Sequence, residues 1–227
     1  MVSLDLPNGV QIRDLAGVWR RSLLIDAGGQ RDDTSEVYWL QVGARAGDIR
    51  ARANTPHAET AFVGTLSKSG QVFTWKPIIA HGSVTDGAPD EGTLTFEGSQ
   101  LREDGVHSPY VEYWQKEEIA GEHDCAMEFR APSGTTGFLL SVGRFGFCAA
   151  PRPGGSIFVL AEHDGREHIA RLCVASGQGP SLEAGAPVPW PKQTGDSLAF
   201  PEGCFGPPHT APMKSFSLRS DTGRASQ

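Results

Sequence analysis

Three side chains that can donate or accept protons stand in segments whose patterns favour β-strands. Glu112 lies in YVEYWQKEE, Asp48 lies in GDIRARA, and His81 directly follows QVFTWKPIIA. Burial against apolar walls moves the pKa of such groups toward neutrality, where general acid–base catalysis is most effective. If the protein is an enzyme, we expect Glu112, His81 and Asp48 to be catalytic, without a cofactor, in an isomerisation, dehydration or cyclisation.

Each of these residues also has a simpler interpretation. Asp48 and Arg50 stand two positions apart, so they share one face of a strand and form an ion pair either on the surface or in the interior. On the surface such a pair contributes at most about 1 kcal/mol. Glu112 is otherwise a surface partner across neighbouring strands, and His81 otherwise shapes the turn that begins at GSVTDG.

Tryptophans on the same strands favour binding over catalysis, and a small-molecule-binding protein is the leading expectation. Pockets for small molecules combine apolar walls with a few polar groups that fix the ligand's orientation. Burial of aromatic surface contributes about 25 cal/mol per Å². We therefore expect a small, largely apolar or amphipathic ligand with one polar group. The residues expected to bind it are Trp39, Gln41, Arg50, Trp75, Glu112, Trp114 and Arg144.

No motif for a metal or a cofactor is present. The sequence contains no nucleophile elbow, phosphate-binding glycine loop, dinucleotide fingerprint or H-E-x-x-H pair. His163 and His168 flank a turn with two carboxylates nearby, but their spacing matches no standard ligand set and favours a solvated hairpin tip. Four widely spaced cysteines form no C-x-x-C pair and are expected to be buried free thiols. They are Cys125, Cys148, Cys173 and Cys204.

The elements that must position these residues are short strands. The 28 glycines and 16 prolines separate short alternating segments, and helical periodicity is almost absent. Turn-forming stretches such as KSGQ, DGAPDEG and APSGTTG join several of these segments. The pattern predicts an all-β chain that closes into an antiparallel barrel.

The stretch LAGVWRRSLL carries Gly-x-Trp at the start of the first strand, at Gly17 and Trp19. Glycine lets the chain turn in close to a barrel floor, and the broad indole plugs that end. The motif resembles the calycin signature of lipocalins and fatty-acid-binding proteins. The resemblance implies that both residues are structural and that a late basic residue, Arg144 or Arg171, packs over Trp19 as a cation–π contact.

A longer resemblance covers about residues 15 to 150. The segments EVYWLQVGARAGDIRARANT, DEGTLTFEGSQLREDGVHSPYVEYWQKEE and GFLLSVGRFGFC are similar, in order and spacing, to segments of the fungal kinase-interacting HRI family and its uncharacterised bacterial relatives. That family resembles calycins in fold, so the resemblance implies a barrel. Its kinase association implies a third function, a module that binds a protein partner through an exposed aromatic patch while its barrel is packed shut.

At about residue 177 the alternating pattern ends and the sequence becomes rich in proline and glycine. We expect a calycin-like barrel domain over residues 1–176 and a Pro/Gly-rich C-terminal segment over 177–227. Proline removes hydrogen-bond donors from a ladder, so this segment is not expected to supply a central strand. It either forms a loosely ordered tail or is held across the barrel mouth by Trp190, Phe200 and Phe205.

Charge and hydropathy exclude several classes of partner. The formal net charge is -7 and the charges of both signs are interspersed, so we expect no nucleic acid to bind. No apolar run approaches the roughly 18 residues of a membrane span, and the N-terminal sequence lacks the pattern of a secretion signal. We expect a cytoplasmic protein, and the sequence leaves its oligomeric state open.

Overall fold

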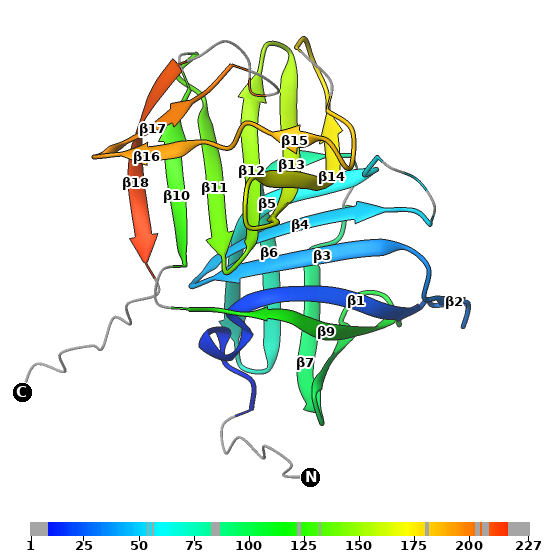
Figure 1. Ribbon diagram of the computed structural model, residues 1–227. Helices are drawn as coiled ribbons and strands as arrows, with labels where there is room; N and C mark the ends of the chain where they lie inside the picture. Colours follow the sequence, from blue (N-terminus) through cyan, green and yellow to red (C-terminus); the bar gives the residue numbers. More distant parts are fainter. Residues whose placement is uncertain are drawn as a thin grey trace, which may run out of the picture.

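The first half of the chain forms a closed antiparallel β-barrel in the computed structural model (Figure 1). The structure describes residues 9–53, 55, 57–82, 87–121, 124–131, 133–179, 182–202, 205 and 209–217. The last barrel strand pairs with the first and so closes the ring, and β2 (Arg31–Asp32) only extends β1 in a short hairpin. The eight strands of the ring are β1 (Gly17–Ile25), β3 (Glu36–Val42), β4 (Arg45–Ala51), β5 (Thr60–Ser69), β6 (Val72–His81), β7 (Asp90–Glu97), β8 (Gln100–Gly105) and β9 (Val111–Ile119).

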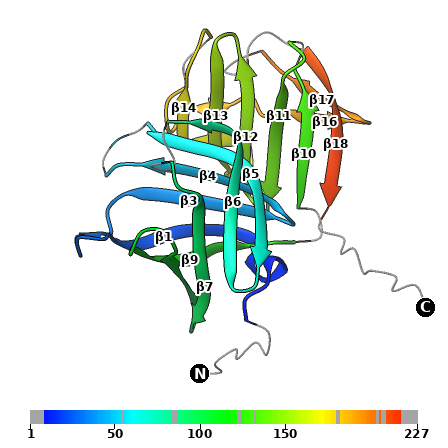
Figure 2. The same ribbon diagram turned by 180° about the vertical axis from the view of Figure 1, so that it is seen from behind.

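A second antiparallel sheet packs against one side of the barrel (Figure 2). Its strand order is β15-β14-β13-β12-β11-β10-β18-β17-β16, and it curls without closing. These strands are β10 (Cys125–Arg130), β11 (Thr136–Val142), β12 (Phe145–Arg152), β13 (Gly155–His163), β14 (His168–Ala175), β15 (Pro187–Val188), β16 (Lys192–Thr194), β17 (Ser197–Phe200) and β18 (His209–Ser217). The expected all-β fold with an antiparallel barrel is confirmed.

The boundary between the two sheets differs from the one that the sequence suggested. The barrel ends with β9 at Ile119, and the strands from Cys125 to Ala175, expected to belong to the barrel, hydrogen-bond in the second sheet. The described part of the C-terminal segment is neither a loose tail nor a cap on the barrel mouth. It supplies four strands, of which β18 pairs on both sides, with β10 and β17. The expectation that this segment supplies no central strand was therefore wrong.

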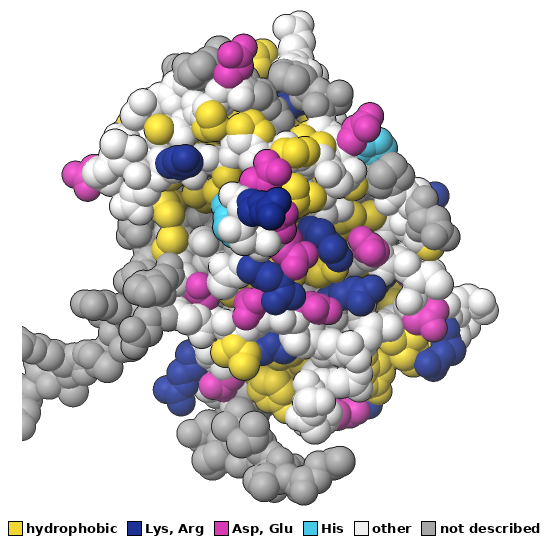
Figure 3. Space-filling view, viewed as in Figure 1, with side chains coloured by type: hydrophobic (Ala, Val, Ile, Leu, Met, Phe, Trp, Pro, Cys, Tyr) yellow, Lys and Arg dark blue, Asp and Glu magenta, His cyan; other side chains and the backbone are white. Residues whose placement is uncertain are grey.

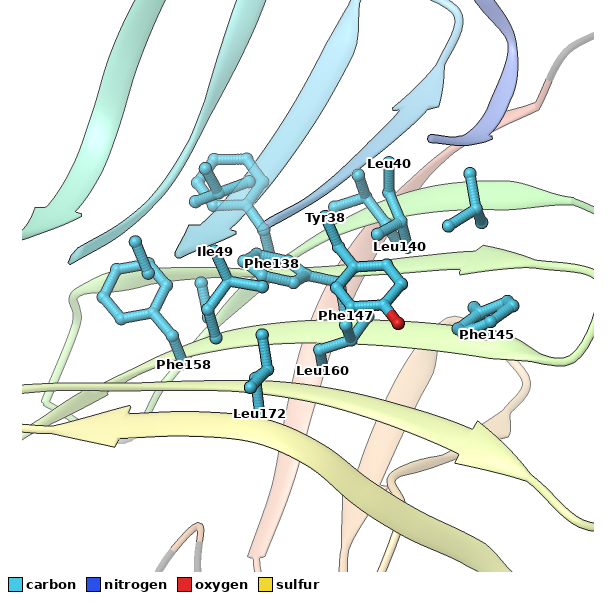
Figure 4. Close-up of a cluster of buried hydrophobic side chains, with 14 of the residues drawn as sticks. Tyr38, Leu40, Ile49, Phe138, Leu140, Phe145, Phe147, Phe158, Leu160 and Leu172 are labelled. Carbon is cyan, nitrogen blue, oxygen red and sulfur yellow. The ribbon is translucent and has the colours of Figure 1, made fainter. Parts of the chain in front are cut away.

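Large apolar side chains from both sheets fill the space between them (Figure 4). Tyr38 and Leu40 alternate along β3 with Val37 and Trp39, which point into the barrel, so Tyr38 and Leu40 point outward. Ile49 on β4 pairs with Tyr38 and points the same way. β3 is therefore covered on both faces, which explains why EVYWLQV is almost continuously apolar. From the second sheet come Phe138, Leu140, Phe145, Phe147, Phe158, Leu160 and Leu172.

One glycine permits the close approach of the two sheets. A Cβ atom added at Gly47 would lie 2.7 Å from Cδ1 of Phe147, which is closer than such contacts allow. Only a residue without a side chain lets the phenyl ring lie directly against β4. The opposite face of the second sheet is covered by its own C-terminal part. Residues from that part that pack there include Val188, Trp190, Leu198, Phe200, Phe205 and Ala211.

The barrel is closed at the end where β1 begins. The 3₁₀ turn η1 (Ile12–Leu15) lies there, and the indole of Trp19 donates a hydrogen bond of 2.7 Å to the Leu15 carbonyl. Gly17 has φ +139°, and a Cβ at that position would lie 2.6 Å from a backbone oxygen of β9. Both residues thus occupy the closed end of the barrel, where the Gly-x-Trp motif was expected to lie.

The basic residue over Trp19 is Lys116, and neither Arg144 nor Arg171 reaches the indole. Lys116 Nζ lies 4.4 Å from the ring centroid and donates to the Ala16 carbonyl at 3.0 Å. Burial lowers the pKa of this ammonium group, and Asp14 opposes that effect. β9 pairs directly with β1, so its side chains reach this closed end of the barrel, whereas Arg171 lies in β14 and Arg144 in the β11–β12 turn of the second sheet.

The surface shows no segregation of charge on the face drawn in Figure 3. Lys and Arg side chains alternate with Asp and Glu side chains across its centre. No helix among the described residues is long and apolar enough to cross a membrane. Cys125 is only partly buried, whereas Cys148 and Cys173 are buried. Cys204 lies outside the described residues.

Candidate functional site

A cleft of about 560 Å³ opens at the end of the barrel opposite η1. The turn after β1, the end of β4, the start of β7 and the β8–β9 turn surround it. The barrel wall is shorter on this side, because β7 begins at Asp90 and pairs with β6 only over Val72–Trp75, although β6 continues to His81. The lining residues are Arg21, Leu24, Asp26, Ala27, Gly28, Arg50, Ala88, Pro89, Asp90, Glu91, His107, Ser108, Tyr110 and Glu112.

Two ion pairs form the floor of the cleft, and the first joins β1 to β9. Arg21 Nη1 donates to Glu112 Oε1 at 2.7 Å, and Arg21 Nη2 donates to Asp32 Oδ2 at 3.1 Å. The side chains of Arg21 and Glu112 are only 7% and 5% exposed. Removal of one member would leave the other charge buried without its partner, so the pair fixes both side chains at this position.

The second ion pair lies within β4. Arg50 Nε donates to Asp48 Oδ1 at 2.7 Å, and Nη2 donates to Oδ2 at 3.4 Å. The sequence left open whether this pair lies on the surface or inside, and the structure places it inside. The Asp48 side chain is 4% exposed and Arg50 faces the cleft. Burial raises the pKa of Asp48, and the adjacent guanidinium of Arg50 opposes the rise.

A buried carboxyl group lies next to the first pair across the sheet. Glu103 on β8 stands directly opposite Glu112 on β9. Its oxygens accept hydrogen bonds from the Tyr110 hydroxyl at 2.8 Å and from the Trp114 indole nitrogen at 3.1 Å. Burial, together with the charge of Glu112, raises the pKa of Glu103 well above its ordinary value. Glu103 is therefore a carboxylic acid that holds its proton more firmly than an exposed glutamate.

Asp90 differs from the other acidic residues at the floor because its carboxylate accepts no hydrogen bond from any described residue. It lines both the cleft and a small void beneath it. Burial raises the pKa of Asp90 to about 6, and the charge of Arg50 opposes the rise. Asp90 therefore exchanges its proton near neutral pH while facing the cleft.

The tryptophans expected to hold an apolar ligand instead fill the barrel below the charged floor. Trp39 stacks on Trp19 at 6.2 Å and meets the rings of Trp75 and Trp114 edge-on at 5.6 and 5.7 Å. Trp39, Trp75 and Trp114 border a small void of about 10 Å³, which is about the size of one water molecule. They do not line the open cleft, so their apolar surface is covered by one another and by Phe62.

The structure brings Arg50, Glu112 and Asp48 together at the floor of the cleft and places Gln41 and Arg144 elsewhere. Gln41 is fully buried and accepts the indole hydrogen of Trp39 at 2.9 Å. Arg144 stands at the β11–β12 turn, where it bonds Glu162 at 2.7 Å and Glu118 at 3.0 Å. It lies outside the barrel and does not line the cleft.

His81 does not line the cleft either. It pairs with Ala61, whose side chain packs between the two sheets, so His81 shares the outer face of the barrel wall. The imidazole rings of His163 and His168 lie 4.9 Å apart, and His168 stacks on Trp190 at 4.7 Å. Burial lowers the pKa of His168 to about 4. Among the described residues, no three His, Cys, Asp or Glu side chains gather as they would around a metal ion.

Sequence reasoning missed most of the cleft lining, and the missed residues on which the site depends are Arg21, Asp90, Glu103 and Tyr110. Strand alternation carried a signal for three of them, because each stands two positions from a residue that points into the barrel. Asp90 carried no such signal. It follows proline and glycine in DGAPDEG, where an aspartate is typical of a turn.

The fold and the site define the class of protein: a closed antiparallel barrel packed on a curled sheet, with a charged cleft at the open end. No family model and no curated protein matches the chain. The chain is similar in structure to the uncharacterized protein YLR301w from Saccharomyces cerevisiae, with a TM-score of 0.53 and 13% sequence identity. The match covers 75% of this chain and 95% of the yeast protein. This likeness supports the fold alone, and the more specific expectation of a lipocalin-like barrel stays a prediction.

Proposed function

We propose that the protein binds a small polar molecule in the cleft at the open end of its barrel. The observation that carries this proposal is the combination of a concave space of about 560 Å³ with a floor of buried, fixed charges. That volume lies within the range of small-molecule sites, and groups held rigidly by ion pairs orient a ligand at little entropic cost.

The lining favours a more polar ligand than the sequence suggested. Asp90, Glu112, Arg50 and Tyr110 face the cleft, whereas the tryptophans below are already covered by other side chains. A largely apolar molecule would remove these charged groups from water without supplying hydrogen bonds, which costs free energy. A ligand with several hydrogen-bonding groups would replace the lost water contacts.

A thermal-shift screen with a variant that fills the cleft tests this proposal. Ala88 is exposed and lines the cleft, so Ala88→Trp places an indole in the space without disturbing the core. A ligand at a hundred times its Kd stabilises the folded protein by about 2.7 kcal/mol, which raises Tm by roughly 5 to 10 °C for a chain of this size. We expect polar compounds to do so for the wild type and not for Ala88→Trp.

The matched control is Ala175→Trp, which adds the same indole at an exposed position at the end of β14. This variant should respond to each compound as the wild type does. If Ala88→Trp also responds like the wild type, the compounds bind elsewhere and the proposal fails.

A second candidate is a cofactor-free enzyme, favoured by two carboxyl groups that border the same void and whose pKa values burial raises, to about 6 for Asp90 and well above the ordinary value for Glu103. Carboxyl groups with raised pKa values are typical of general acids and bases. This arrangement assigns the proton-transfer role to Asp90 instead of His81. Turnover of a bound compound, measured by mass spectrometry as a change in the mass of that compound, should then be lost in Asp90→Asn. Binding without turnover in the wild type would leave only the binding function.

The third expectation, a module for a protein partner, receives less support. It requires an exposed aromatic patch, and the large apolar side chains that are exposed among the described residues are Ile78, Val106 and Ile119. None of them is aromatic, and Ile78 stands on β6 whereas Ile119 ends β9. The cytoplasmic location and the lack of a nucleic-acid partner stay predictions.

A further inference from the structure

We infer that the cleft selects a ligand with a positively charged organic ammonium group, which binds at the carboxylates of Asp90 and Glu112. This inference rests on the proposed small-molecule function and names the chemical class of the ligand. It is carried by the balance of charge at the floor of the cleft and by the carboxylate oxygens that no described residue occupies.

The guanidinium groups at the floor are already paired with carboxylates. Arg21 lies between Glu112 and Asp32, and Arg50 lies against Asp48. An anionic ligand would have to compete with these carboxylates for the same guanidinium groups. Neither arginine is therefore left as an unneutralised receptor for an anion.

The carboxylates, in contrast, exceed the guanidinium groups. Asp26, Asp90, Glu91 and Glu112 line the cleft, Asp48 and Glu103 border the void directly below it, and Arg21 and Arg50 are the arginines among the same lining residues. Even when Glu103 carries a proton, five carboxyl groups face two guanidinium groups, so the site has an excess of negative charge. A positively charged ligand would reduce this excess.

Two of these carboxylates have free oxygens that face the space. The Glu112 side chain is 5% exposed, its Oε1 accepts from Arg21, and its Oε2 accepts no hydrogen bond from a described residue. Asp90 accepts none with either oxygen. An ammonium group has three donors and no acceptor, so it matches a pair of free carboxylates that surround a water-accessible space.

Three probes of matched shape and different charge test the inference: benzylamine as the cation, benzyl alcohol as the neutral compound and benzoate as the anion. Their binding is followed by protein-observed NMR at physiological ionic strength, which screens attraction to the acidic surface as a whole. We expect benzylamine to bind at least about tenfold more tightly than benzyl alcohol, and benzoate to bind most weakly. Ala88→Trp should abolish the binding of benzylamine.

The isosteric variant Asp90→Asn identifies the receptor. This variant should weaken the binding of benzylamine by about tenfold and leave the affinity for benzyl alcohol unchanged. In the wild type, benzylamine should bind more tightly as the pH rises through about 6, because Asp90 becomes ionised, and Asp90→Asn should lack this dependence. The charged and titratable groups around Asp90 are Arg21, Asp26, Asp48, Arg50, Glu91, Glu103, His107, Tyr110 and Glu112. His107→Gln should keep the dependence, which separates His107 from Asp90.

The outcomes that overturn the inference are distinct from those that overturn the proposed function. If benzyl alcohol or benzoate binds as tightly as benzylamine, and Ala88→Trp abolishes this binding, the cleft binds small molecules but does not select a cation. If Ala88→Trp leaves benzylamine binding intact, the cation binds elsewhere. If no probe binds, the inference also fails, and the endogenous ligand alone then decides the proposed function.

Discussion

Replacement of Asp90 by asparagine should remove part of the pH dependence of folding stability. Burial raises the pKa of Asp90 from 3.8 to about 6, so between these values the folded protein keeps a proton that the unfolded chain releases. Stability therefore falls as the pH rises through this window. The difference in pKa corresponds to up to about 3 kcal/mol, lost by the wild type and not by Asp90→Asn.

The assay is urea unfolding of the wild type and Asp90→Asn at several pH values from below 4 to above 6. The two proteins share all other titrating groups, including Asp48 and Glu103, whose pKa values burial also raises. The difference between their unfolding free energies therefore reports the titration of Asp90, together with an effect of the same sign from its charge, which raises the pKa of Glu103. As the pH rises from about 4 to about 6, the unfolding free energy of Asp90→Asn should increase by up to about 3 kcal/mol relative to that of the wild type.

An exposed aspartate provides the control for loss of one negative charge. Asp33→Asn changes the net charge by the same amount at a solvent-exposed position. If the unfolding free energies of the wild type and Asp90→Asn run parallel over the whole pH range, burial does not raise the pKa of Asp90. If the wild type gains stability relative to Asp90→Asn as the pH rises, the pKa of Asp90 is lowered, since that sign belongs to a carboxylate that is stabilised when ionised.

Other predictions follow from the two ends of the barrel and are measured by urea unfolding at neutral pH. Lys116→Met should cost about 2 kcal/mol, because it removes the cation over Trp19 and its hydrogen bonds to backbone carbonyls; the exposed Lys76→Met should cost far less. Gly17→Ala should cost about 3 kcal/mol, since a Cβ would meet a β9 carbonyl oxygen at 2.6 Å at a positive φ, and an unchanged stability would contradict this geometry. Glu112→Gln should cost about 3 kcal/mol by depriving Arg21 of its buried partner; a neutral effect would mean that Asp32 alone suffices.

The barrel was predictable because strand alternation and turn residues are local signals. GVWRRSLLI and YVEYWQKEE were both predicted as strands, and in the structure they pair to close the ring. Membership of a sheet is not a local property. The strands over 125–175 resemble barrel strands in composition, but they pair with one another and with β18, far along the chain.

The sequence did not predict the C-terminal strands, because the effect of a proline on a strand depends on which residues pair with it across the sheet. Pro212 lies within β18, yet the pairing of β18 with β10 begins only at Met213. The missing amide hydrogen of Pro212 is therefore not needed in that ladder. Pro187 similarly stands in the two-residue edge strand β15, where a single ladder partner is present.

The candidate site was predictable only in part. Arg50 and Glu112 were identified because each shares a strand face with residues that fill the barrel. The tryptophans on those faces also fill space, and sequence gave no measure of how much space remained. Asp90 was missed because its position depends on where β7 begins relative to β6, which is a property of the closed ring.

Native mass spectrometry of the protein purified from its own host shows whether the cleft binds a small polar molecule. One small polar compound should be bound to each wild-type and Ala175→Trp chain, and none to Ala88→Trp, whose indole occupies the cleft. A wild-type protein that carries no compound, or a compound that Ala88→Trp retains equally, would show that the cleft holds no such molecule.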